Sequence, residues 1–342
     1  AVEIRTDHPL KDLNTFQVSV RAERYVRFDL LEEIPAFLAS EDLAEEELLI
    51  LGGGSNLLFT GDVTGTILHP AMKGVKILEA DDESVRIRVM AGEVWDDLVA
   101  VAVANGWGGI ENLSLIPGSV GASAVQNIGA YGVEVETVIE GVEAISLPAG
   151  RRVSFPADAC GFGYRDSCFK SRWPGRHLIT AVVFKLQRRP LLCLDYAGVK
   201  EHLDLIGPPT LANVRQAVIN LRKSKLPDPA VLGNAGSFFK NPVVDEAQLK
   251  ELMREAPALP HYPHGEGRFK LAAGWLIDRC GWKGKTRGDA AVHDQQALVL
   301  VNRGRASGEE ILHLSRSIEQ SVRQRFGVRL EREVRVVGGD AD

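Results

Sequence analysis

Two glycine-rich stretches in the first half of the chain carry the clearest chemical signal. The first is Gly52-Gly53-Gly54-Ser55-Asn56, which directly follows a short apolar run. Because glycine has no Cβ, such a loop lets backbone N–H groups approach an anion closely, and Ser55 and Asn56 add further donors. Ordinary tight turns share this pattern, so the first loop alone leaves both interpretations open.

The second stretch, residues 117–124 (PGSVGASA), consists almost entirely of small residues. A backbone with so few side chains suits a flat ring system or a pyrophosphate, and the amides of Gln126 and Asn127 suit the polar edge of a flavin. Close helix packing is the alternative for this stretch on its own. Two such loops in one half of the chain favour a site for a large dinucleotide.

Neither loop matches a common nucleotide motif. No G-K-[ST] follows the first loop, which excludes a Walker motif, and a Rossmann fingerprint would need its third glycine at Leu57. The LLFT segment after the loop is also too short and too apolar to open a helix. A nucleotide bound here therefore requires another architecture.

The hydrophobic pattern predicts the elements that position these loops. Strands are expected before the first loop and over 64–92, 138–147, 177–187 and 296–302, and helices over 30–39, 94–105, 211–224 and 309–326. The last helix has a capping box of Ser307 and Glu310 and a stop at Gly327. Two prolines in KLPDP at 225–229 indicate a boundary before a C-terminal domain.

Composition limits the functional class. The chain has 342 residues and a net charge of −6, which argues against a nucleic-acid surface because phosphate binding relies on clustered Lys and Arg. Its four cysteines form no C-x-x-C pair, so neither a zinc site nor a redox dithiol is expected, and no metal is predicted. No signal core or membrane-length apolar segment is present. We expect a cytoplasmic enzyme with no membrane partner.

Nine ordered segments make the chain resemble the UDP-N-acetylenolpyruvoylglucosamine reductases along nearly its whole length. They are LNTF (13–16), LGGGSNLLF (51–59), AGEVW (91–95), ENLSLIPGSVGASAVQNIGAYG (111–132), CGFGYRDSCFK (160–170), KLPDPAVLGNAGSFFKNP (225–242), KLAAGWLID (270–278), AVHDQQALVLVN (291–302) and LEREVR (330–335).

The resemblance implies an α+β flavoenzyme of three domains. Two FAD-binding lobes of the vanillyl-alcohol-oxidase type are expected over 1–70 and 71–225, and a UDP-sugar substrate-binding domain over 226–342. The implied reaction is NADPH-dependent, FAD-mediated reduction of UDP-N-acetylglucosamine enolpyruvate to UDP-N-acetylmuramate. The segment LDYAGVK at 194–200 resembles the longer type of the family, in which a tyrosine (here Tyr196) closes over the substrate.

The family chemistry places three residues at the reaction centre. Hydride is expected to pass from flavin N5 to C3 of the substrate, and Ser237 matches the donor of the proton to C2. Arg165 and Glu333 match the residues that stabilise the intervening enolate. The family often has proline where this chain has Arg332, so Glu331 is the second choice for the catalytic glutamate.

The remaining expected site residues fall into two groups. The expected FAD ligands are Gly52, Gly53, Gly54, Ser55, Asn56, Leu57, Pro117, Gly118, Ser119, Gly121, Ala122, Ser123, Gln126, Asn127, Gly129 and Ala130. The expected substrate ligands are Tyr164, Tyr196, Lys225, Asn241 and Gln296.

Two other functions remain open at this stage. One is a flavin-dependent oxidase of the same fold, although Gly52–Phe59 lacks the histidine through which many such oxidases tether their flavin. The other is a nucleotide-sugar-binding protein without catalysis, against which the complete set Arg165, Ser237 and Glu333 argues. The oligomeric state is unknown, and a monomer is favoured.

Overall fold

The computed structural model describes residues 2–338, which fold into two compact units. Unit 1 comprises the chain up to His8, Ala22–Gly54 and Thr64–Ser224. Unit 2 comprises Pro9–Arg21, Ser55–Val63 and the chain from Lys225 onward. Two short N-terminal segments therefore belong to the same unit as the C-terminal third, and the division into three domains stays a prediction.

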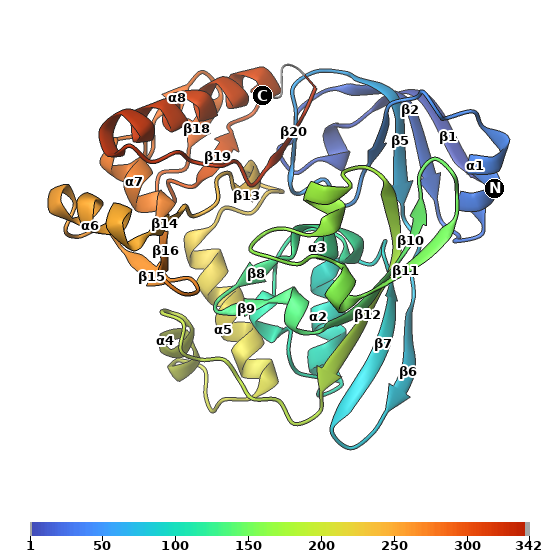
Figure 1. The fold of residues 1–342 in the computed structure, drawn as a ribbon, viewed down its shortest axis with the longest axis horizontal. Coiled ribbons are helices and arrows are strands. Elements are labelled where there is room, and N and C mark those ends of the chain that lie inside the picture. Colours follow the sequence, from blue (N-terminus) through green and yellow to red (C-terminus); the bar gives the residue numbers. More distant parts are fainter. Residues whose placement is uncertain (1, 339–342) are drawn as a thin grey trace. The chain divides into compact units, whose positions relative to one another are not determined.

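Unit 1 is built mainly on two sheets (Figure 1). The first has the order β1 (Glu3–Pro9), β2 (Arg21–Phe28), β5 (Val63–Pro70), β3 (Leu48–Ile50), and β3 pairs parallel to β5. The second is antiparallel, with the order β11 (Arg152–Pro156), β10 (Ile139–Ser146), β12 (His177–Gln187), β7 (Ser84–Met90), β6 (Val75–Ala80).

Helices and short turns complete unit 1. The helices are α1 (Glu33–Ser40), α2 (Trp95–Ala104), α3 (Val120–Gln126), α4 (Val199–Asp204) and α5 (Leu211–Lys225). A two-stranded pair, β8 (Gly129–Ala130) and β9 (Val133–Glu134), follows α3. The single-turn elements are η2 (Glu111–Leu113), η3 (Val135–Thr137), η4 (Ala157–Ala159) and the π-helix η5 (Cys168–Arg172).

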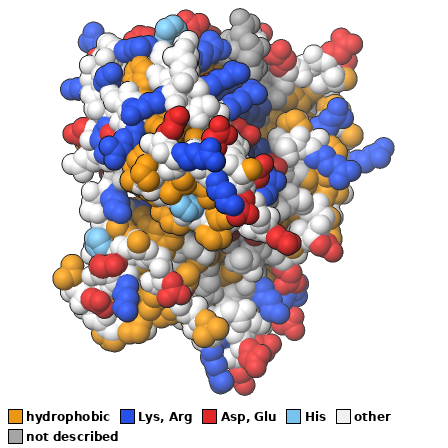
Figure 2. Space-filling model, turned by 60° about the vertical axis from the view of Figure 1, so that its left-hand side comes forward, with side chains coloured by type: hydrophobic (Ala, Val, Ile, Leu, Met, Phe, Trp, Pro, Cys, Tyr) orange, Lys and Arg blue, Asp and Glu red, His pale blue; other side chains and the backbone are white. Residues whose placement is uncertain are grey.

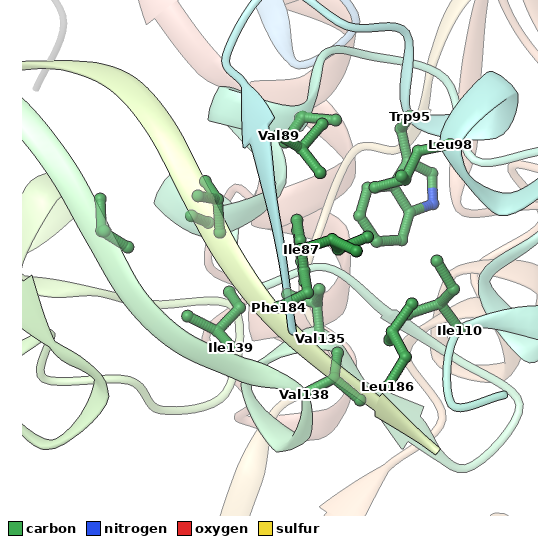
Figure 3. Close-up of a cluster of buried hydrophobic side chains, with 14 of the residues drawn as sticks. Ile87, Val89, Trp95, Leu98, Ile110, Val135, Val138, Ile139, Phe184 and Leu186 are labelled. Atoms are coloured by element: carbon green, nitrogen blue, oxygen red, sulfur yellow. The ribbon is translucent and has the colours of Figure 1, made fainter. Parts of the chain in front are cut away.

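The core of unit 1 fixes the loops between these elements. Trp95 at the start of α2 is completely buried, and its ring centroid lies 6.0 Å from that of Phe184 in β12. Figure 3 shows both rings among Ile87, Val89 and Leu186. Burial of an aromatic side chain contributes a few kcal/mol, so this cluster anchors the start of α2. The Trp95 N–H donates to Gly118 O at 2.9 Å and so connects α2 to the second glycine-rich stretch.

Unit 2 contains three sheets. They are β13 (Gly233–Ser237), β19 (Val299–Asn302), β18 (Ala290–Val292) and β17 (Thr286–Arg287); β14 (Val243–Asp245), β16 (Arg268–Leu271) and β15 (His261–Pro263); and the parallel pair β4 (Leu57–Phe59) and β20 (Arg335–Val337). Its helices are η1 (Lys11–Leu13), α6 (Glu246–Glu255), α7 (Ala273–Arg279) and α8 (Gly308–Phe326).

Most predicted elements are confirmed, including the capping box of α8. Ser307 Oγ accepts the Glu310 N–H at 3.1 Å, and Gly327 ends the helix at φ 66°. Two boundaries were wrong. α1 begins at Glu33 instead of residue 30, because the Glu33 carboxylate accepts N–H groups from the preceding turn. β19 begins at Val299 because His293 Nδ1 accepts the Gln296 N–H in a turn.

Candidate functional site

The two glycine-rich stretches meet in unit 1. A Cβ on Gly53 would lie 2.8 Å from the Cα of Gly118, and one on Gly52 would lie 2.7 Å from Ser119 Oγ. Both distances are shorter than real Cβ contacts, so these positions accept only glycine without movement. The loops thus form one backbone surface stripped of side chains, and such a surface fits a flavin dinucleotide.

The second stretch serves packing as well as the loop surface. A Cβ on Gly121 would lie 2.9 Å from the Cβ of Ala91, so this glycine lets α3 pack closely on the segment after β7. Ser119 caps α3 by accepting the Ala122 N–H at 3.2 Å. The sequence offered a cofactor loop and close helix packing as alternatives, and the structure shows that Gly121 is required for packing.

Asp96 in α2 holds the start of the second stretch. Its carboxylate accepts the Leu115 N–H at 2.6 Å and pairs with Arg215 of α5 at 2.8 Å. Burial by itself would raise the pKa of Asp96, but the hydrogen bonds from Arg215 and Leu115 outweigh it, and the pKa is lowered. The Asp96 carboxylate therefore ties α2, α5 and this loop together.

Asn127 ends α3 in the left-handed conformation with φ 45° and is completely buried. Its amide donates to Gly163 O at 2.7 Å and to Glu134 Oε2 at 3.2 Å, and it accepts the Glu136 N–H at 3.1 Å. These contacts attach the segment after α3 to the loop that begins at Gly163. The predicted flavin-edge role of the Asn127 side chain stays a prediction.

Arg165 lies at the tip of a tight turn. Gly163 and Asp166 exchange two main-chain hydrogen bonds of 3.1 Å, which leaves Tyr164 and Arg165 as the central residues. Arg165 has φ 48°, a conformation that turns of this shape usually give to glycine or asparagine. Its guanidinium donates to Gly129 O at 2.7 Å, so the side chain has a defined direction.

Ser237 and Glu333 come together in unit 2 through main-chain pairing. The Glu333 N–H donates to Phe238 O at 2.8 Å, and the Lys240 N–H donates to Glu331 O at 2.9 Å. These bonds flank an antiparallel bridge between Phe239 and Arg332. The segment that carries Ser237 therefore runs directly beside the segment that carries Glu333.

The same pairing bears on the expectation that the family often has proline where this chain has Arg332. In a pair of this kind, the flanking residues supply the ladder hydrogen bonds. The ladder here uses the N–H groups of Lys240 and Glu333, which flank Arg332. Either residue type is compatible with the position of Glu333.

The rest of the first glycine-rich loop belongs to unit 2. Asn56 Nδ2 donates to Glu333 O at 3.1 Å, and the Arg335 N–H donates to Asn56 O at 3.0 Å. Leu57 then begins β4, whose parallel partner is β20. Asn56, predicted as an FAD ligand, thus also fixes the backbone of the predicted catalytic glutamate.

The motif LNTF at 13–16, to which the sequence gave no role, supports the Ser237 strand. The Asn234 N–H donates to Thr15 O at 3.0 Å, and a Cβ on Gly233 would lie 2.5 Å from Phe16 O. The rings of Phe16 and Phe238 make an edge contact at 6.3 Å. This N-terminal motif is therefore part of the scaffold of unit 2.

The predicted substrate ligands are divided between the two units. In unit 1, Tyr164 lies under the Arg165 guanidinium at 5.2 Å, and Tyr196 makes an edge contact with Tyr131 at 5.6 Å. Tyr131 is tied in turn to the loop before α4, because Asn112 Nδ2 donates to both Tyr131 O and Cys193 O. Tyr196 thus belongs to an anchored loop.

In unit 2, Asn241 has a structural contact of its own. Its Oδ1 accepts the Ala273 N–H at 3.0 Å and so caps the first turn of α7. Lys225 is the last residue of α5, and Gln296 lies in the turn before β19. The structure therefore groups Ser237, Glu333, Asn56 and Asn241 on the scaffold of unit 2.

Sequence reasoning missed Lys170, which contacts two predicted site residues. Its Nζ lies 2.9 Å from Gln126 Oε1 and 3.1 Å from Arg165 O. The residue lies within the family segment CGFGYRDSCFK at 160–170, and that was the available signal. Its spacing from Arg165 did not show the contact, because the π-helix η5, which begins at Cys168 and contains Lys170, was not predicted from the sequence.

Three general features bear on the class of site. In residues 2–338, no group of three or more His, Cys, Asp or Glu side chains could hold a metal ion. No helix within the same range is long and apolar enough to cross a membrane. The face in Figure 2 carries Lys and Arg side chains together with Asp and Glu.

Comparison with known proteins identifies the class first. Residues 22–155 match a family model described as an FAD binding domain, which includes both glycine-rich stretches. The backbone surface formed by Gly53 and Gly118 fits such a cofactor. The chain is therefore an FAD-dependent oxidoreductase with a mixed α and β fold.

The particular family follows from the second set of matches. Residues 228–337 match the C-terminal domain of UDP-N-acetylenolpyruvoylglucosamine reductase. The reductase of Chromobacterium violaceum is 49% identical over 97% of this chain and 98% of its own, and that of Burkholderia orbicola is 48% identical over 97% of each. The crystal structure of the reductase from Thermus caldophilus covers 99% of both chains with a TM-score of 0.67 and 26% identity. The chain belongs to the UDP-N-acetylenolpyruvoylglucosamine reductase family.

Proposed function

We propose that the protein reduces UDP-N-acetylglucosamine enolpyruvate to UDP-N-acetylmuramate for peptidoglycan precursor synthesis, with non-covalent FAD and with NADPH as reductant. Family membership over almost the whole chain supports the reaction. The glycine surface of Gly52, Gly53 and Gly118 supports the cofactor. When bound, FAD supplies the two-electron chemistry that carries hydride from NADPH to the substrate.

The juxtaposition of Ser237 and Glu333 carries this proposal. The hydrogen bond from Glu333 N–H to Phe238 O holds the two residues on neighbouring segments. In the proposed mechanism, the Ser237 hydroxyl gives a proton to C2 of the substrate. Glu333 stabilises the enolate that develops beside it.

Arg165 is the proposed counter-charge for the enolate and the adjacent carboxylate. Its guanidinium is permanently charged and presents several donors in a planar fork. The contact with Gly129 O at 2.7 Å and the turn around Gly163 and Asp166 restrict its direction. A donor held in place before the reaction loses little entropy when charge develops.

The proposed substrate contacts are those of Tyr164, Tyr196, Lys225, Asn241 and Gln296. We assign the chain to the longer type of the family, on the basis of Tyr196 in the anchored loop before α4. We further propose a cytoplasmic monomer that binds UDP-sugar and NADPH and neither nucleic acid nor membrane.

The test is an anaerobic experiment in two halves. Purified protein is reduced with NADPH while the visible flavin spectrum is recorded, and UDP-N-acetylglucosamine enolpyruvate is then added. We expect the flavin band to bleach and then to return. Ser237→Ala should leave bleaching unchanged and slow the return by about 10²- to 10⁴-fold, the usual contribution of a positioned acid.

A matched control and two outcomes complete the test. Ser317→Ala in α8 removes a hydroxyl that accepts a hydrogen bond from Arg287 outside the proposed site, and it should leave both halves unchanged. A flavin that stays reduced until oxygen enters would instead indicate an oxidase. A colourless protein that cannot be reconstituted with FAD would point to a binding protein without catalysis.

A further inference from the structure

Lys170 links two parts of unit 1 that the proposed function uses separately. Its ammonium lies 2.9 Å from Gln126 Oε1 at the end of α3 and 3.1 Å from the main-chain oxygen of Arg165. Ser167 lies directly before the π-helix that carries Lys170, and its Oγ donates to Val125 O of α3 at 2.7 Å. This hydrogen bond fixes the start of the π-helix to α3. Lys170 therefore projects from a rigid base.

The contact with Gln126 determines which way the amide faces. An ammonium group only donates hydrogen bonds, so the atom of Gln126 that faces it must be the oxygen. The NH2 group of Gln126 then points away from Lys170. Lys170 thereby makes Gln126, an expected FAD ligand, a donor towards its remaining surroundings. Gln126 is the last residue of α3, the helix that begins directly after Gly118 and Ser119 of the glycine surface.

The contact with Arg165 stabilises an unfavourable backbone. Arg165 has φ 48°, in the left-handed region that is unfavourable for a residue with a Cβ. A charged hydrogen bond to its carbonyl is among the stronger contacts available, since charge-assisted bonds are roughly twice as strong as neutral ones. Lys170 is thus well placed to hold the turn that aims the Arg165 guanidinium at Gly129 O.

We propose that Lys170 is a positioning residue that orients Gln126 as a hydrogen-bond donor to the flavin and holds the Arg165 turn. The proposal rests on the proposed function, because it concerns the same cofactor and the same arginine. Lys170 acts through these two neighbours and transfers neither a proton nor a hydride. Its ammonium also brings a positive charge to the side of Gln126 opposite the NH2 group.

The experiment uses the FAD-loaded protein and three variants at this position. Lys170→Met keeps the length of the stem and removes every donor, Lys170→Arg keeps charge and donors, and Lys170→Gln keeps donors without charge. We expect Lys170→Met to shift the visible flavin spectrum and to slow flavin reoxidation by substrate by about 10- to 100-fold, since misplacement by about 1 Å can cost 10²-fold. KM should change much less, because Arg165 acts on charge that develops in the transition state.

A double-mutant comparison tests the route through Gln126. In a Gln126→Ala background, Lys170→Met should no longer shift the flavin spectrum, although it should still slow reoxidation through Arg165. Lys170→Arg should keep most of the wild-type flavin spectrum and most of the wild-type reoxidation rate. Lys170→Gln should keep the wild-type spectrum more closely than the wild-type rate. Lys76→Met on the exposed strand β6 is the matched control and should change nothing.

The outcomes separate this inference from the proposed function. If the wild-type protein does not reoxidise with substrate, the proposed function fails. If the wild type does so and Lys170→Met matches it in spectrum and rate, the role of Lys170 is overturned. An equal loss in Lys170→Met and Lys170→Arg, with an unchanged flavin spectrum in both, would also overturn it, because the residue would then be structural only.

Discussion

The turn that carries Arg165 and the strands that carry Ser237 and Glu333 are held by different kinds of contact. Around Arg165, side chains make most of the contacts. Asn127 donates to Gly163 O, Lys170 donates to Arg165 O, and Ser167 donates to Val125 O. Around Glu333, the main chain makes most of the contacts, through ladder bonds between residues 238–240 and 331–333, and the Asn56 side chain adds one hydrogen bond to Glu333 O.

This difference bears on which substitutions each region tolerates. A side-chain contact is lost when one residue changes, and the group that it leaves behind loses that hydrogen bond. A ladder bond survives every substitution except one to proline. We therefore expect the Arg165 region to be sensitive to its neighbours and the Glu333 region to depend on the backbone.

Asn127→Ala should give the largest effect. It removes three hydrogen bonds from a completely buried amide and places alanine at φ 45°, so we expect a loss of about 4 kcal/mol in the free energy of unfolding. Asn127→Gly keeps the backbone conformation and should recover about 1 kcal/mol. Chemical denaturation measures both, and a loss below 1 kcal/mol in Asn127→Ala would contradict the comparison.

Acid should give the next largest effect, a loss of stability in unit 1, which contains the Arg165 region. Burial lowers the pKa of His69 to about 4, with Arg27 adding to the shift, and Tyr25 OH lies 2.6 Å from Nδ1 of the neutral ring. Since the unfolded histidine titrates near 6.5, this stabilisation is complete above pH 6.5 and is lost as the pH falls towards 4. At about 1.4 kcal/mol per pH unit, the loss reaches about 3 kcal/mol.

The measurement is the free energy of unfolding between pH 7 and pH 4. His69→Phe should remove most of this dependence, because a ring that cannot be protonated has no pKa to shift. The ladder around Glu333 consists of main-chain groups and contributes no such slope. A wild-type protein as stable at pH 4 as at pH 7 would show that His69 can be charged in the folded state.

The sequence predicted the parts of this site that depend on residue type. Glycines at 52, 53 and 118 predict a surface without side chains, and the capping box predicts where α8 begins. The contacts of Lys170 and Asn127 could not be predicted in the same way. They join residues up to 44 positions apart, and no spacing rule shows which oxygen a lysine side chain reaches.

The role of LNTF shows a second limit. Its position near the N-terminus predicts membership of the first lobe, yet it pairs with β13 of unit 2. Local propensity carries no information about which distant segment a loop will contact. The sequence also could not predict the left-handed φ of Arg165, because arginine does not favour that conformation.

Lys240→Pro breaks the ladder at one of its donors. The Lys240 N–H donates to Glu331 O at 2.9 Å, and proline has no such group. We expect a loss of about 1–3 kcal/mol in unfolding free energy, together with slower flavin reoxidation, because Glu333 would lose its alignment with Ser237. Lys240→Ala removes the 3.8 Å contact with the Glu331 carboxylate and keeps the ladder, so it should cost much less.

Arg332→Pro should have the smallest effect, although it puts a proline only one position from a ladder donor. In this pairing with Phe239 the flanking residues supply the ladder hydrogen bonds, so stability should stay within about 0.5 kcal/mol and flavin reoxidation should be unchanged. Arg332→Ala separates the effect of the side chain from that of the backbone. Burial raises the pKa of Glu319 in α8, and the Arg332 charge opposes this rise. Any small change that comes from loss of the Arg332 charge should therefore appear in both variants. If Arg332→Pro instead matched Lys240→Pro, Glu333 would depend on the residue before it, and the two regions would be held in the same way.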